Sequence, residues 1–371
     1  MTKKKKVCCW DLEGPISVLD FAAEIGRLLS EKVLDLQKYD MGEFFTMISN
    51  YDDYLIDTPG IKERIGIPEY QPGDTLRLMA PLYVAYFSDR ELIELARSNL
   101  GLLPGSKELM ALLHKDWDVY VISTSYTQFA YNVTKELNIP QDHVYCTNLH
   151  IDELKKGLTD IGASIDVLVG SIFEKYLESD KNLDIVIDDI NKYFWKRENS
   201  ESDYIKVMNQ VKVRGGRRKE LAVEDISNRT DVPIIDMIAL GDSITDINML
   251  QRLKDEGGIA VSFNGNRFSL KRANVAVTTP NNLGALPIFE NKNKINNFLE
   301  EWEKTYPSFS DDPKKIPEDL ISKECKSHFI YYEFVPFIAD LKDKSKSELE
   351  NIISSQELMR KEVRGWAGNL G

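Results

Sequence analysis

Short apolar runs that end in small or acidic residues alternate with helical patterns along the chain. The runs cover residues 7–10, 119–122, 144–146, 234–240, 259–263 and 275–278. Between several of them, apolar residues recur at intervals of three and four, which is typical of amphipathic helices. Strands that alternate with helices predict an α/β fold, in which helices cover both faces of a parallel sheet.

Other stretches of the chain are predicted to be helical without strands. The strand positions predict a core in residues 1–19 and 101–290, and residues 20–100 are predicted to be helical. Residues 161–212 are predicted to form an acidic helical insertion in the core. Residues 291–371 are predicted to form a charged, largely helical C-terminal extension that lies outside the sheet.

Composition narrows the possible functions. The chain has 371 residues, of which 42% are hydrophobic and 29% charged, so it can bury a large core. A net charge of −13 argues against a nucleic-acid partner. No apolar run reaches the ~18 residues of a membrane span, and the N-terminus has no apolar stretch of the signal-peptide kind. We therefore expect a cytoplasmic protein.

Chemically active side chains follow three of the predicted strands. Parallel strands bring their carboxyl ends to one edge of a sheet, so Asp11, Ser123 and Asp242 should meet there although they are far apart in sequence. A carboxylate such as Asp11 can attack phosphorus and form an aspartyl-phosphate if a neighbouring acid protonates the leaving oxygen. Glu13, two residues further on, suits that second role, and Gly14 permits a tight turn.

The same edge offers ligands for a hard cation. Asp242 and Asp246 are one helical turn apart after Gly241 and, together with Asp11, can hold Mg²⁺ through carboxylate oxygens. We also count Glu13 among the metal-binding residues. Such an ion would offset the repulsion between these carboxylates and a phosphate group.

Two further groups can bind phosphate oxygens. Ser123 and Thr124 supply hydroxyls beside free backbone amides. Lys219 ends a basic segment before a predicted helix and supplies a positive charge. Each feature alone has a structural interpretation as a helix cap, a turn or a solvated face. Their joint occurrence in this order favours a catalytic site.

This order of motifs resembles the haloacid dehalogenase superfamily, in particular its phosphoserine-phosphatase-like branch, and implies a Rossmann-like core. The matching segments are V-C-C-W-D-L-E-G, V-Y-V-I-S-T-S-Y-T-Q-F, a lysine before L-A-V-E-D-I, and I-A-L-G-D-S-I-T-D. The resemblance implies that residues 1–19 and 101–290 form the catalytic core and that residues 20–100 form a helical cap domain over the nucleophile. It also implies that Asp11 is the nucleophile and Glu13 the general acid/base, that Ser123 and Lys219 bind the phosphate, and that Asp242 and Asp246 bind Mg²⁺.

The chain departs from the family pattern at Thr245, where an asparagine or another small polar residue is frequent, and at two places that bear more directly on the chemistry. Glu13 stands where most family phosphatases have aspartate, and similar relatives with D-L-E-G can pass the phosphoryl group to an alcohol instead of water. Thr124 and Ser125 replace the paired glycines that are common after the second-motif serine.

The leading hypothesis is a Mg²⁺-dependent phosphatase that acts on a small phosphorylated metabolite through an aspartyl-phosphate. One alternative is a phosphotransferase with an alcohol acceptor. Another is a non-catalytic binding or assembly protein that kept the fold, with a protein partner bound through the insertion at 161–212 or the C-terminal extension.

Overall fold

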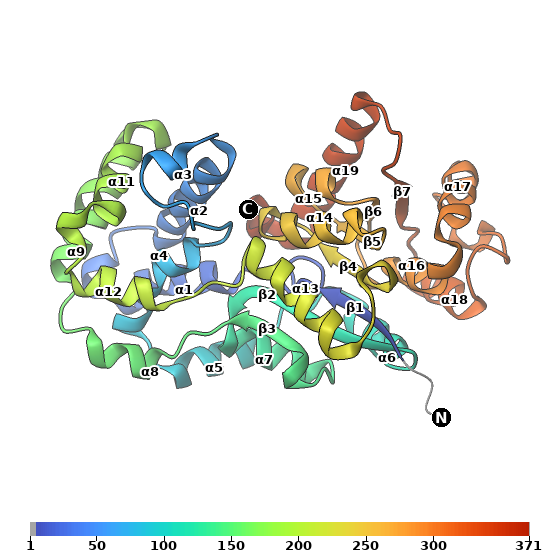
Figure 1. The fold of residues 1–371 in the computed structure, drawn as a ribbon, viewed down its shortest axis with the longest axis horizontal. Coiled ribbons are helices and arrows are strands. Elements are labelled where there is room, and N and C mark those ends of the chain that lie inside the picture. Colours follow the sequence, from blue (N-terminus) through green and yellow to red (C-terminus); the bar gives the residue numbers. More distant parts are fainter. Residues whose placement is uncertain (1–4, 371) are drawn as a thin grey trace.

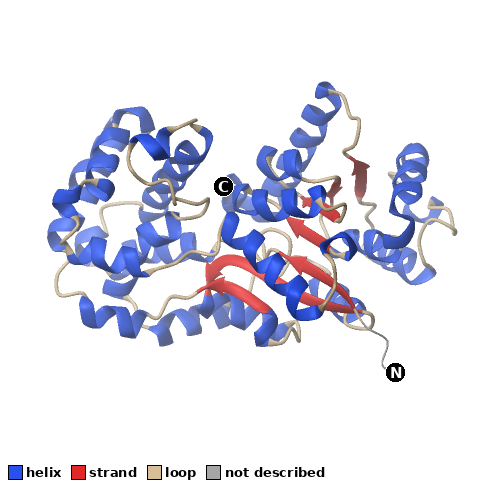
Figure 2. Cartoon of the chain, viewed as in Figure 1, coloured by secondary structure: helices blue, strands red, loops and turns tan. Residues whose placement is uncertain are grey.

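A single seven-stranded sheet forms the centre of the molecule, in the order β3-β2-β1-β4-β5-β6-β7 (Figures 1 and 2). The computed structural model describes residues 5–370; residues 1–4 of the predicted core and residue 371 of the predicted extension lie outside that part. The strands are β1 Lys6–Trp10, β2 Trp117–Tyr126, β3 Val144–Thr147, β4 Ile238–Gly241, β5 Ile259–Phe263, β6 Val275–Thr278 and β7 Phe337–Asp340. All neighbouring strands are parallel except β6 and β7. The predicted α/β fold class is therefore confirmed.

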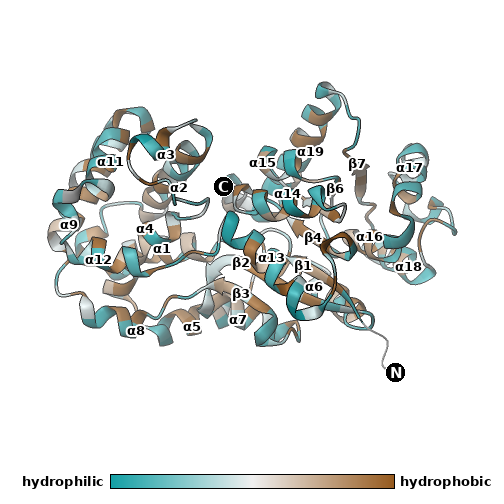
Figure 3. Cartoon of the chain, in the orientation of Figure 1, coloured by the Kyte–Doolittle hydropathy of each residue, from teal (hydrophilic) through white to brown (hydrophobic). Residues whose placement is uncertain are grey.

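Helices cover both faces of the sheet, as the apolar strands require. Cys8 and Cys9 on β1 point to opposite faces and enter different hydrophobic clusters. Figure 3 shows the amphipathic pattern of these helices, each with hydrophilic and hydrophobic parts. The core helices are α6 Ser106–Leu113, α7 Thr127–Glu136, α13 Arg217–Thr230, α14 Ile247–Asp255, α15 Arg267–Arg272 and α16 Leu286–Glu290. Within residues 5–370, none of the helices has the length and apolarity that a membrane crossing demands.

A helical lobe stands at the carboxyl end of the sheet, on the left of Figure 1. Its first part is α1 Phe21–Lys32, α2 Met41–Asp57, α3 Ile61–Arg64, α4 Thr75–Tyr86 and α5 Asp89–Ser98. Its second part is α8 Ile151–Leu154, α9 Gly162–Val167, α10 Glu174–Glu178, α11 Ile187–Trp195 and α12 Asp203–Gln210. A π-helical turn, Leu168–Phe173, joins α9 to α10.

The two parts of this lobe pack on each other. The Tyr204 hydroxyl of α12 donates to the carbonyl of Leu78 in α4 at 2.6 Å. The indole of Trp195 donates to the hydroxyl of Tyr51 in α2 at 2.7 Å. Residues 161–212, predicted as an insertion in the core, thus extend the layer of helices that residues 20–100 begin.

Two strand boundaries differ from those predicted. Residues 234–240 were expected to be one strand, but Ile234–Asp236 forms a short 3₁₀ turn and only Ile238–Gly241 joins the sheet. Asp236 pairs with Lys292 at 2.9 Å at the surface, a contact that a central strand would not allow. The second strand does not end before Ser123 but continues to Tyr126.

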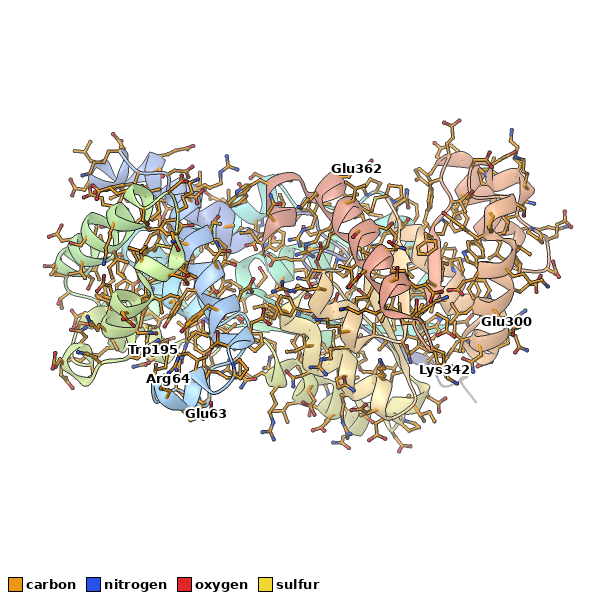
Figure 4. All side chains as sticks on the ribbon, turned by 90° about the horizontal axis from the view of Figure 1, so that it is seen from above. Glu63, Arg64, Trp195, Glu300, Lys342 and Glu362 are labelled. Atoms are coloured by element: carbon orange, nitrogen blue, oxygen red, sulfur yellow. The ribbon has the colours of Figure 1, made fainter. Side chains whose placement is uncertain are left out.

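The prediction that residues 291–371 lie outside the sheet is wrong. The segment contains α17 Ile295–Thr305, α18 Lys323–Tyr331, β7 and α19 Lys346–Arg364. β7 pairs antiparallel with β6, from Val275 opposite Asp340 to Thr278 opposite Phe337. It spans only four residues, too few to establish an alternating pattern in sequence. In Figure 4, Glu362 marks α19 between the helical lobe, where Trp195 is labelled, and the opposite end, where Glu300 is labelled.

Candidate active site

The end of β1 and the loop after β4 approach each other closely. The amide of Asp11 donates to the carbonyl of Leu240 at 2.9 Å, which extends the ladder between the two strands by one bond. Gly14 has φ +109°, and a Cβ atom there would lie 2.0 Å from an Asp242 carboxylate oxygen. Only glycine lets the backbone turn at this point without displacing Asp242.

The loop after β4 holds Asp246 in a fixed position. One of its carboxylate oxygens accepts from the amides of Asp242 and Ser243 at 2.9 and 3.1 Å. Gly241 is needed here, because a Cβ atom would lie 2.5 Å from the Asp246 carboxyl carbon. The short turn Ile244–Asp246 then leads into α14.

Lys219, in the first turn of α13, connects the two loops. Its ammonium group lies 2.8 Å from Asp11 Oδ1 and 2.7 Å from Asp246 Oδ1, and the side chain is fully buried. Burial alone would lower the pKa of Lys219, but the two carboxylates reverse this and raise it. Burial and then the charge of Asp246 raise the pKa of Asp11, while Lys219 opposes the rise. The lysine is therefore a fixed cation between two aspartates.

Three carboxylates are arranged as a divalent cation would require. Oxygens of Asp11, Asp242 and Asp246 lie within 4.8 Å of one another, and all three residues are buried. Asp242 Oδ1 is buried without a hydrogen-bond partner among residues 5–370, so one ligand atom is available. Hard carboxylate oxygens are the donors that Mg²⁺ prefers, and the residues present fit that ion.

Glu13, which we also predicted as a metal ligand, lies next to this trio but is not one of it. Its Oε1 accepts from the amide of Phe21 at the start of α1, at 2.9 Å. Burial, and then the charge of Asp20, raise the pKa of Glu13 to about 8. A carboxyl group in this state holds a proton near neutral pH.

The two predicted hydroxyl residues lie differently. The Ser123 side chain is fully buried, and its Oγ accepts from the amide of Ser125 at 3.1 Å. Thr124 borders the same cavity as Asp11 and Glu13, and its hydroxyl donates to the carbonyl of Arg214 at 3.3 Å. Of the two, Thr124 is the residue whose surface the cavity includes.

The helical lobe closes over this cavity through residues 70–74. Asp52 of α2 accepts from the Tyr70 hydroxyl at 2.6 Å and from the Gly73 amide at 2.9 Å, which orders the segment. Asp74 pairs with Arg218 of α13 at 2.6 Å, so the lobe is joined directly to the helix that carries Lys219. The cavity between the lobe and the sheet has a volume of about 70 Å³.

Sequence reasoning missed two arginines in this cavity, Arg360 and Arg364 of α19. Arg360 contacts Asp242 Oδ2, and Arg364 donates to the same oxygen at 3.1 Å. Both arginine side chains are only 4% exposed. Ile352 and Gln356 precede them at intervals of four, so all four residues share one face of the helix. Arginines that continue the buried face of an amphipathic helix were the available signal.

The comparisons with known proteins agree with this architecture. A family model described as haloacid dehalogenase-like hydrolase matches residues 105–289. No curated protein sequence matches the chain. The mostly parallel sheet and the carboxylates near the ends of β1 and β4 define a Rossmann-like α/β protein with a buried acidic site. The chain belongs to the haloacid dehalogenase-like hydrolase family.

One solved structure shows the same fold over the whole chain. The structure of gene product AF1437 from Archaeoglobus fulgidus has a TM-score of 0.72 and 23% sequence identity, and the match covers 99% of each chain. The extension that carries α19 therefore falls within the matched length. A substrate-bound phosphoserine phosphatase complex has a TM-score of 0.47 and 13% identity over 76% of this chain and 98% of that chain.

Proposed function

We propose that the protein is a Mg²⁺-dependent phosphatase that acts on a small phosphorylated metabolite through an aspartyl-phosphate on Asp11. The observation that carries this proposal is the buried cluster of Asp11, Asp242, Asp246 and Lys219, in which one carboxylate oxygen has no described partner. That oxygen, Asp242 Oδ1, is costly to bury unless a ligand such as a cation contacts it.

In the proposed reaction, an oxygen of Asp11 attacks phosphorus while the carboxyl group of Glu13 donates its proton to the departing alkoxide. Glu13, now a carboxylate, then takes a proton from the water that hydrolyses the aspartyl-phosphate. The raised pKa of Glu13, about 8, supports the first of these roles, because the group must be protonated before it can act as an acid.

The other roles in the proposed reaction belong to the metal ion, Lys219 and Thr124. Asp11, Asp242 and Asp246 would hold Mg²⁺, which when bound supplies Lewis-acid stabilisation of the phosphoryl oxygens. Lys219 keeps Asp11 oriented through the 2.8 Å contact and offsets its charge, so that an anionic substrate is not repelled. Thr124 lies at the cavity wall, and its hydroxyl would exchange its hydrogen bond to the Arg214 carbonyl for one to a phosphate oxygen.

A panel of phosphate esters assayed with Mg²⁺ and with EDTA tests this function. We expect hydrolysis that requires Mg²⁺ and that Asp11→Asn reduces by about 10⁴-fold or more, on the scale known for removal of a nucleophile. Asp118→Asn is the matched control, because Asp118 lies at the other end of the sheet on β2, where it is half-buried and pairs with Lys5. Unchanged turnover in Asp11→Asn would exclude Asp11 as the nucleophile.

The same assay separates hydrolysis from transfer. Adding small alcohols and analysing for new phosphate esters would detect a phosphotransferase, and release of inorganic phosphate alone supports a phosphatase. Absence of turnover on the whole panel, with or without Mg²⁺, would favour the binding or assembly alternative. A protein partner at residues 161–212 or at the C-terminal extension stays a prediction.

A further inference from the structure

Arg364 has hydrogen-bonding capacity that its present contacts do not use. A guanidinium group has five N–H donors. Those of Arg364 reach the carbonyls of Val18 and Leu19 at 3.2 and 3.3 Å and Asp242 Oδ2 at 3.1 Å. Among residues 5–370, two of its N–H groups therefore have no assigned acceptor, one on each terminal nitrogen, although the side chain is nearly buried.

Arg364 borders the cavity in which, under the proposed function, the leaving group would lie. Glu13 and Asp20 border the same cavity. Under the proposed function, Glu13 protonates the departing oxygen, so the alcohol half of the substrate lies beside Glu13. Arg364 shares this cavity and is the arginine there that has two N–H donors without an assigned acceptor among residues 5–370.

Arg360 has a different task. Its Nε and Nη2 donate to the carbonyls of Gly368 and Leu370 at 3.1 and 2.8 Å, and its Nη1 contacts both the carbonyl and the carboxylate of Asp242. Four of its contacts are thus with the C-terminal segment and with Asp242. Gln356, one turn earlier, donates to the carbonyls of Ser262 and Val277 at 2.8 and 3.1 Å. These contacts hold α19 on the sheet and Arg364 in the cavity.

We propose that Arg364 is a substrate-binding residue that receives a second anionic group, a carboxylate or a phosphate, carried by the alcohol half of the phosphate ester. This inference rests on the proposed function, because Glu13 defines the leaving-group side. A planar guanidinium group with two available N–H donors matches the two oxygens of such an anion. The C-terminal extension thereby completes the substrate site and selects acidic phosphate esters.

Esters matched in length test the inference. Ethyl phosphate and 2-phosphoglycolate differ in that a methyl group replaces a carboxylate, and ethylene glycol bisphosphate carries a second phosphate instead. We expect the wild type to prefer one acidic ester over ethyl phosphate by about 10- to 100-fold in kcat/KM, the range of a charged hydrogen-bonded contact. The preferred ester identifies the anion as carboxylate or phosphate.

Arg364→Ala should remove most of that preference, mainly through a higher KM for the acidic ester, and Arg364→Lys should restore part of it. Lys361→Ala is the matched control, because Lys361 is a cation on the same helix but is exposed. If Arg364→Ala unfolds, Arg364→Gln replaces it. An equal loss on neutral and acidic esters would overturn the proposal, as would a wild type without preference or a variant more active than the wild type.

Calorimetric binding separates this inference from the proposed function. In the Asp11→Asn background, ethyl phosphate, 2-phosphoglycolate and the bisphosphate can be titrated without turnover, with and without Arg364→Ala. If Arg364→Ala weakens the binding of an acidic ester more than that of ethyl phosphate, the inference is supported even if the wild type hydrolyses nothing, in which case only the proposed function fails. Equal binding of all three esters to the Asp11→Asn protein and to the double variant would overturn it.

Discussion

The two sides of the site neutralise their buried aspartates in different ways. On one side, a single lysine from the core, Lys219, lies between Asp11 and Asp246. On the other side, two arginines from the last helix converge on Asp242. The lysine is fixed by α13, which packs on the sheet itself. The arginines are more than 110 residues from Asp242 in sequence and depend on the docking of α19.

This difference separates two kinds of role. A lone cation between two carboxylates has no substitute, so the lysine side should tolerate no change. Two cations on one carboxylate are partly redundant. One of the two arginines can therefore donate hydrogen bonds to a ligand while Asp242 stays paired. The following predictions, from the largest expected effect to the smallest, test that contrast.

Lys219→Met should have the largest effect, because it leaves Asp11 and Asp246 buried without their common cation. Breaking one partner of a buried ion pair costs roughly 3–5 kcal/mol, and we expect a loss of that size in the free energy of unfolding. Turnover should disappear as well. Urea unfolding in the presence of EDTA measures the stability, and added Mg²⁺ should recover part of the loss.

Lys107→Met is the control for this experiment. Lys107 pairs with Glu136 at the surface, so its loss should change stability by less than about 1 kcal/mol. A Lys219→Met protein as stable as this control would mean that the two aspartates do not need the lysine, and the contrast between the sides would fail.

Glu13→Gln should come next, with an effect on chemistry and little on folding. General acid/base groups contribute about 10²- to 10⁴-fold to rate, so turnover should fall within that range. Glutamine can still accept the hydrogen bond from the Phe21 amide, which preserves the start of α1. Rapid-quench measurements should show that both the formation and the hydrolysis of the aspartyl-phosphate are slower. If both steps kept their wild-type rates, the acid/base would be another residue.

The parts of this site that sequence could predict are those that lie next to buried strands. Asp11 and Asp242 follow apolar runs, and parallel strands must end at one edge, so their meeting follows from the pattern alone. Asp246 follows from its spacing to Asp242. Lys219 was placed by its basic segment and by family resemblance, and its double contact needed the structure.

The extension could not be predicted in the same way. β7 is only four residues long, and nothing in its sequence shows that it pairs with β6. From the sequence alone, Arg360 and Arg364 are expected to be exposed charges on a helix surface, because long basic side chains are usually exposed. The spacing after Ile352 and Gln356 places them on the buried face of the helix, but a contact across more than 110 residues leaves no local pattern that identifies Asp242 as their partner.

Compared with Lys219→Met and Glu13→Gln, Arg360→Gln should cause the smallest change in free energy. Asp242 would keep Arg364 as a partner, so no buried carboxylate is left alone, and we expect a loss of only about 1–3 kcal/mol in the free energy of unfolding. The change should act locally, because Arg360 also holds the carbonyls of Gly368 and Leu370. Compared with the wild type, Arg360→Gln should speed up hydrogen exchange in residues 365–370 and leave exchange in the sheet unchanged.

Arg252→Gln on α14 serves as the control, because Arg252 is a half-buried arginine that pairs with Glu224 and Glu256. This variant should leave hydrogen exchange in residues 365–370 unchanged. If Arg360→Gln were as destabilising as Lys219→Met, the arginines would not be redundant, and Arg364 would have no free capacity to offer a substrate.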